Sequence, residues 1–175
     1  MVLPRRMSDI VANCDAIKRR IAVAAQTARR DPASIKLIAV SKTKTESDVR
    51  TALAAGQKIF GENRVQEAKT KFTTLCAKYP DLKLHLIGSL QTNKAEDAVR
   101  LFDVIETLDR PRLANALAEA IQKTGRTPEF YIEVNIGDEL QKAGICLCVS
   151  ARTTAVLYSR ATRERDQVQQ GQNGS

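Results

Sequence analysis

The apolar positions along this chain follow two different spacings in turn. From residue 8 to residue 28, apolar side chains recur every three or four positions, as they do on one face of an α-helix. Residues 35–41, by contrast, form an almost continuous apolar run, which is typical of a parallel strand buried on both faces. The chain is therefore expected to open with a helix that is followed by a buried strand.

The same alternation of strand and helix continues to residue 136. Further helices are expected at 45–55, 64–79, 92–101 and 111–124, and further strands at 58–60, 82–87, 103–106 and 130–136. Thr45, with Asp48 three positions later, resembles a capping box at the start of a helix. Gly56 and Gly125 stand where two of the helices should end, and Pro80 stops a third. These local signals agree with the apolar pattern.

Five strands separated by helices define the fold class. They recur with a mean period of about 23 residues, and strict alternation predicts a mostly parallel sheet covered by helices. A doubly wound sheet and a (β/α)8 barrel of the TIM type both fit this pattern. The short, even period favours the barrel. We therefore expect an α/β fold with about five barrel units and an N-terminal helix.

The pattern is not continued after residue 145. Residues 146–175 contain no lysine, and their last part is rich in Gln, Gly, Asn and Ser, a composition typical of disordered segments. The sequence therefore predicts a partial barrel domain over residues 1–145 and a divergent, partly disordered tail over residues 146–175.

Composition narrows the classes of ligand. The 28 lysines and arginines exceed the 20 acidic residues, so the net charge of +8 favours anionic ligands. Aromatic residues make up only 4% and tryptophan is absent, which argues against the stacking platforms of nucleic-acid binding proteins. We expect no nucleic-acid or membrane partner and a cytoplasmic location.

Four cysteines without a C-x-x-C pair, and one histidine, predict reduced thiols and no metal site.

A lysine follows the first expected strand. Because side chains alternate in a strand, Ile38, Val40 and Lys42 share one face. If that face lines the interior of a barrel, Lys42 lies at the carboxyl mouth, where barrels of this type place their reactive groups. Partial desolvation by Ile38 and Val40 would lower the pKa of Lys42 and allow its amine to attack an aldehyde. The alternative is a solvated lysine at a strand end.

Other polar side chains recur at the ends of the following strands. Asn63 follows the second strand, where it could hydrogen-bond a ligand or cap the next helix. His85, within the third strand, is either structural or directed toward a pocket. Gln91, Asn93 and Lys94 open the next helix, and Asn135 ends the fifth strand. Because the carboxyl ends of parallel strands meet at one rim, these residues together predict a ligand site there.

The residues at these strand ends match a known set of motifs. The motifs are Ala39–Lys44 (A-V-S-K-T-K), Phe60–Asn63 (F-G-E-N) with Val65–Glu67 (V-Q-E), His85–Gly88 (H-L-I-G) with Leu90–Lys94 (L-Q-T-N-K), and Lys142–Ile145 (K-A-G-I). Over residues 8–145 the chain resembles the pyridoxal phosphate (PLP) homeostasis proteins, which are similar to the N-terminal barrel of alanine racemase, PLP fold type III.

The resemblance implies roles for three residues. Lys42, and not Lys44, would hold PLP as a Schiff base, Asn63 would lie beside the cofactor, and His85 would lie near the pocket. Two departures stand out: Thr45 replaces a usual proline, and residues 146–175 do not match the family's phosphate loops or its R-I-G segment.

The function that the resemblance implies is intracellular PLP homeostasis without established turnover, with apo PLP enzymes as candidate partners. We find no tyrosine or cysteine placed as a second acid or base, so no catalytic residue is assigned. The alternative is a PLP-dependent amino-acid racemase with Lys42 as base. A basic interaction protein that keeps only the fold is a third hypothesis.

Overall fold

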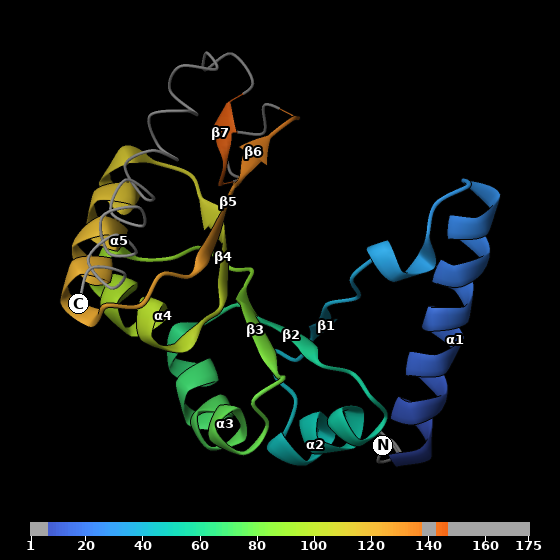
Figure 1. The fold of residues 1–175 in the computed structure, drawn as a ribbon. Helices are drawn as coiled ribbons and strands as arrows, with labels where there is room; N and C mark the ends of the chain where they lie inside the picture. The colour runs from blue at the N-terminus through green and yellow to red at the C-terminus, as the bar shows by residue number, and fades with distance from the viewer. Residues whose placement is uncertain (1–6, 138–142, 147–175) are drawn as a thin grey trace, which may run out of the picture.

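Figure 1 shows the computed structural model, which describes residues 7–137 and 143–146. Its helices are α1 (Met7–Thr27), α2 (Glu46–Ala54), α3 (Val65–Lys78), α4 (Ala95–Leu101) and α5 (Pro111–Thr124), with short 3-10 turns η1 at Pro32–Ser34 and η2 at Thr92–Lys94. Its strands are β1 (Ala39–Val40), β2 (Ile59–Glu62), β3 (Lys83–Leu86), β4 (Val104–Leu108), β5 (Glu129–Ile132), β6 (Val134–Asn135) and β7 (Ile145–Cys146).

The strand order decides between the two folds that the sequence allows. Strands β1 to β5 form one parallel sheet in the same order as in the chain. A doubly wound sheet reverses its order part-way, whereas a barrel wall adds each strand beside the last. Helices α2 to α5 lie along one side of the curved sheet (Figure 1). The predicted barrel-type α/β fold is confirmed.

The hydrophobic core lies between the sheet and these helices. The sheet contributes buried side chains such as Phe60, Leu84, Leu86 and Ile105, and the helices contribute Phe72, Leu75, Leu113 and Leu117. The opposite, inner face of the sheet is more open, because Val40 and Tyr131 remain 50% and 54% exposed. The described residues thus form one packed layer on the outer side of the sheet.

Most of the predicted elements are observed close to their expected bounds. The capping box at Thr45 and Asp48 is present, since each residue's side chain accepts a hydrogen bond from the other's backbone N–H. Gly125 ends α5 with a φ of +67°, in the left-handed region that favours glycine. Local capping chemistry and apolar periodicity were therefore sufficient to place these helices.

The prediction was less accurate for two strands. Residues 35–41 contribute only the two-residue β1, and the Leu37 carbonyl accepts from the side chain of Gln57 instead of joining the ladder. The expected strand at 130–136 divides into β5 and β6, and β6 pairs with β7 in parallel. A two-residue strand such as β7 has no periodicity from which a sequence could predict it.

The predicted boundary at residue 145 stays a prediction, because residues 147–175 lie outside the described residues. None of the described helices is long and apolar enough to cross a membrane.

Candidate functional site

Three of the motif segments meet at the carboxyl ends of the strands. A Cβ atom built on Gly61 would lie 3.0 Å from side-chain carbons of both Ile38 and Ile87, so these residues occupy the same inner face. Asn63, just after β2, lines the same rim as Ile87, and Lys42 lies in the turn that follows β1. The structure therefore brings the segments that carry Asn63 and Ile87 to one rim.

A cavity of about 640 Å³ opens at this rim. It is lined by Asn63, Ile87, Gly88, Ser89, Glu133, Val134, Asn135, Ile136, Gly137 and Ala143. Of the polar residues predicted at this rim, Asn63 and Asn135 line the cavity, whereas the lining does not include Lys42, His85, Gln91, Asn93 and Lys94. The Oδ1 atom of Asn63 is buried without a hydrogen-bond partner among the described residues. An acceptor of this kind is one that a bound donor would satisfy.

Gly88 fixes the shape of this cavity. A Cβ atom at Gly88 would lie 2.3 Å from the carbonyl oxygen of Asn63 and 2.7 Å from its Cα, closer than any side chain allows. Only glycine therefore lets the end of β3 approach the Asn63 backbone this closely. The glycine of the H-L-I-G motif thus has a steric role beside Asn63.

We expect Gly88→Ala to destabilise the fold by about 1–3 kcal/mol, because the added methyl group overlaps backbone atoms and forces Asn63 away. Urea unfolding measures the loss, and the NMR shift of the Asn63 side-chain amide reports its displacement. Ser89→Ala, which removes atoms at the next position, is the matched control and should change little. Equal stability of Gly88→Ala and the wild type would contradict this account.

Lys42 lies just past the end of β1, but it is not buried there. Its side chain is exposed, and Val40, which was expected to desolvate it, is half exposed. The expected desolvation is therefore wrong for the described residues, because too little of the structure packs over the inner face beside β1. Lys42 also does not line the 640 Å³ cavity, so the structure does not bring Lys42 and Asn63 into one enclosed pocket.

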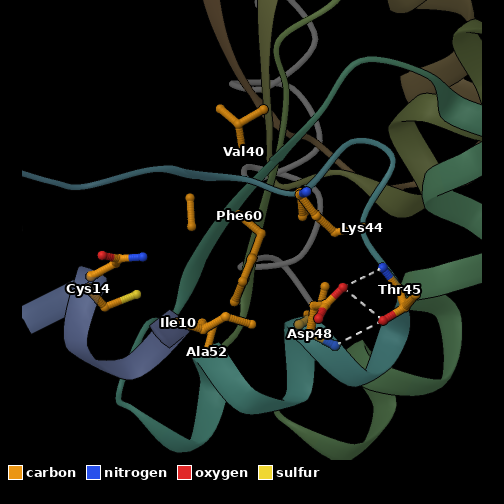
Figure 2. A pocket seen from close by; sticks show the side chains of 12 residues that line it. Ile10, Cys14, Val40, Lys44, Thr45, Asp48, Ala52 and Phe60 are labelled. Atoms are coloured by element: carbon orange, nitrogen blue, oxygen red, sulfur yellow. Dashed lines mark hydrogen bonds between the residues drawn. The ribbon is translucent and has the colours of Figure 1, made fainter. Parts of the chain in front are cut away.

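Lys44 is separated from Lys42 by a turn. Thr43 has a φ of +62°, in the left-handed region, so the regular strand alternation ends there. Lys44 lines a second cavity of about 450 Å³ between α1, β1 and α2. Figure 2 shows Lys44 beside the Thr45–Asp48 capping box, with Ile10 and other apolar side chains across the cavity. Lys44 thus lies at a cavity whose lining does not include Lys42.

His85 is buried in β3 and paired with a carboxylate on the next strand. Its Nδ1 atom lies 2.6 Å from Oε1 of Glu106. His85 is not among the residues that line the rim cavity, and it lies one strand position deeper on this face than Ile87, which does line it. The structure therefore gives His85 a partner within the sheet, below the rim.

A buried charge network that the sequence reading missed surrounds the backbone on both sides of Lys42. The Lys71 ammonium donates to the Ser41 carbonyl at 2.8 Å, to Glu62 Oε1 at 2.9 Å and to Glu67 Oε1 at 3.2 Å. The Ser41 hydroxyl donates to Glu62 at 2.7 Å, and the Thr43 N–H donates to Glu67 at 2.7 Å. These contacts hold the segment that carries Lys42.

The electrostatics of this network follow from its hydrogen bonds. The Thr43 N–H bond and the nearby Lys71 ammonium lower the pKa of Glu67 below its ordinary value. One sequence signal could have revealed the network. Lys71 lies on the same side of α3 as the apolar residues Ala68 and Phe72, and four positions after Glu67. A lysine on a buried helix face requires an acidic partner.

The fit of these residues to PLP differs between the two ends of the cofactor. Lys42 supplies an accessible amine for the aldehyde, and Asn63 supplies an open acceptor at the rim. The wall of the cavity, however, contains Glu133, whose pKa is raised by burial and by the nearby Asp109. No lysine or arginine lines the cavity within residues 7–137 and 143–146. Lys42 thus suits the aldehyde end, and the described lining of the rim cavity offers the phosphate no cationic side chain.

Comparison with known proteins identifies the family. The family described as "Alanine racemase, N-terminal domain" matches residues 12–164. The "Pyridoxal phosphate homeostasis protein" of Pasteurella multocida (strain Pm70) is 40% identical over 136 residues, which are 78% of this chain and 58% of that relative. The chain therefore spans a little over half the length of this relative.

Solved structures of related proteins also match this chain. PipY of Synechococcus elongatus PCC7942 is 34% identical, and the match covers 86% of this chain and 82% of PipY. The TM-score is 0.62 for PipY without PLP and 0.59 for PipY with PLP bound. The alanine racemase of Streptomyces coelicolor A3(2), 18% identical with a TM-score of 0.65 over 90% of this chain and 39% of that one, shares the fold. The chain belongs to the alanine racemase N-terminal domain family, and its resemblance to the pyridoxal phosphate homeostasis proteins is confirmed.

Proposed function

We propose that this chain binds pyridoxal 5′-phosphate as a Schiff base on Lys42 and takes part in intracellular PLP homeostasis. The observation that carries the proposal is the exposed Lys42 just past the carboxyl end of β1, in a fold that a relative solved with PLP bound shares. When bound, PLP supplies an electrophilic aldehyde and an electron sink.

The residues around Lys42 suit a reversible carrier. Lys42 would supply the amine that holds the aldehyde group of PLP, with one water released as the link forms. Asn63 would accept a hydrogen bond from the bound group, and Gly88 keeps Asn63 in place. A Schiff base on an exposed lysine is accessible to water, so water can also hydrolyse it. This reversibility suits the release of PLP to apo PLP enzymes in the cytoplasm.

We expect borohydride reduction of the protein mixed with PLP to label Lys42. Peptide mapping should find the reduced adduct on Lys42, lose it in Lys42→Ala and retain it in Lys44→Ala. The Lys44 variant is the matched control, because Lys44 is a second exposed lysine of the same motif on the other side of the Thr43 turn. Label on Lys44 with Lys42 untouched would contradict the assignment.

We also expect no robust turnover of amino acids, against the alternative of a racemase with Lys42 as base. A positioned acid or base contributes about 10²–10⁴-fold to such reactions, and His85, the histidine of this face, is engaged by Glu106 below the rim. Racemisation of L- and D-alanine is followed by chiral chromatography beside free PLP. A rate well above free PLP that disappears in Lys42→Ala would support the racemase instead.

A further inference from the structure

Resting on the proposed function, we propose that Glu62, Glu67 and Lys71 act together as positioning residues for Lys42. These three residues, here called the charge clamp, hold the backbone on either side of Lys42 and so set the direction in which its amine faces an aldehyde. None of them is assigned contact with the reacting atoms.

The contacts of the charge clamp fall on both neighbours of Lys42. On one side, Ser41 is held twice, since its carbonyl accepts from Lys71 and its hydroxyl donates to Glu62. On the other side, the Thr43 N–H donates to Glu67. Lys42 is thus the central residue of a three-residue segment that is fixed at both ends.

The clamp contacts the backbone beside Lys42, while Lys42 itself is exposed. Glu62 and Ser41 are buried toward the helix layer, where Lys71 reaches them from α3. The clamp can therefore hold the segment that carries Lys42 and leave the Lys42 amine accessible to a ligand.

The clamp maintains an unusual backbone conformation at Thr43. A φ of +62° is unfavourable for a β-branched residue, so this conformation persists only where the surroundings impose it. The 2.7 Å bond from Thr43 N–H to Glu67 is one such constraint, and Lys71 holds Glu67 in turn at 3.2 Å. Without them, Thr43 can relax to a negative φ, and the turn between Lys42 and Lys44 would change.

Burial distinguishes this network from ordinary surface ion pairs. The side chains of Lys71 and Glu62 are 9% and 0% exposed, whereas those of Lys69 and Asp97, an ion pair that also starts from α3, are 54% and 33% exposed. The Lys71–Glu62 hydrogen bond is therefore poorly screened and holds a fixed geometry, whereas Glu67, 31% exposed, is held by its bonds to Lys71 and Thr43. Lys69 therefore offers a matched control on the same helix.

The test compares four variants in two measurements. Glu67→Ala removes the Thr43 bond but leaves the buried Lys71–Glu62 pair, so it should still fold, and Glu67→Gln keeps an acceptor at the same place. Glu62→Gln/Lys71→Met removes both buried charges together, and Lys69→Met is the control. The first measurement is amide exchange at Thr43 by NMR without PLP. The second is the yield of borohydride-trapped label on Lys42 at a fixed, limiting PLP concentration.

We expect Glu67→Ala and the double variant to accelerate exchange at Thr43 and to lower the label on Lys42 by about tenfold to a hundredfold, the range for a misplaced reactive group. Glu67→Gln should recover most of the label, and Lys69→Met should match the wild type. Unchanged exchange and unchanged label in Glu67→Ala and the double variant would overturn the clamp.

The two proposals fail in different ways. If the wild type itself gives no label on Lys42, the proposed function is wrong, and the clamp is then judged by exchange at Thr43 alone. Faster exchange in Glu67→Ala, restored in Glu67→Gln, supports the clamp in that case, and unchanged exchange overturns it.

Discussion

Replacing Lys71 with methionine is expected to destabilise the fold by about 3–5 kcal/mol, because it leaves Glu62 as an unpaired charge in the core. Glu62 is 0% exposed, one of its carboxylate oxygens already lacks a partner among the described residues, and the other bonds Lys71. Methionine fills a similar volume, so the loss comes from the charge and not from a cavity. Urea unfolding followed by circular dichroism measures it.

Two further variants separate the charge from other effects of the Lys71 substitution. Lys69→Met breaks the exposed pair with Asp97 on the same helix and should cost about 1 kcal/mol or less. Glu62→Gln/Lys71→Met, which removes both charges, should be more stable than Lys71→Met alone, because no charge is left unpaired. A loss in Lys71→Met no larger than that in Lys69→Met would show that Glu62 does not depend on Lys71.

The order of helices and strands was predictable because capping residues and apolar spacing act over a few neighbouring residues. The capping box at Thr45, the glycine after α5 at Gly125 and the apolar runs of the strands each act over a few residues. The short strands were not predictable in the same way. The length of β1 depends on whether its neighbours offer ladder partners, and Gln57 occupies the carbonyl of Leu37 instead.

The location of the site at the strand ends was predictable, but the burial and the contacts of its side chains were not. Strand alternation placed Asn63 at the rim correctly, since Asn63 lines the cavity there, whereas the side to which Lys42 points stays a prediction. The burial of Lys42 depends on which distant segments pack over it, and no local sequence pattern shows this. In the structure Lys42 is exposed. The charge clamp was missed for the same reason, since Glu62 and Lys71 come from different elements and meet only when α3 packs on the sheet.

Replacing residues 146–175 is expected to have a larger effect than any of the single substitutions, and the effect is on the affinity for PLP. We expect this chain to bind PLP about three to six decades more weakly than a chimera in which residues 146–175 are replaced by the C-terminal part of a full-length relative. The reason is the phosphate. Barrels of this type commonly hold phosphate with the loops after strands 7 and 8, and no lysine or arginine lines the rim cavity within the described residues.

The size of the effect follows from the number of lost hydrogen bonds. A hydrogen bond to a charged group contributes about 1.5–3 kcal/mol, so three bonds to phosphate contribute about 4–9 kcal/mol, and each 1.4 kcal/mol is about one decade in affinity. Titration of PLP into both proteins, followed by the absorbance of the imine, measures the difference. Pyridoxal, which lacks the phosphate, is the control ligand and should bind both proteins about equally. Equal affinity of the two proteins for PLP would contradict this expectation and would show that residues 1–175 supply a phosphate site of their own.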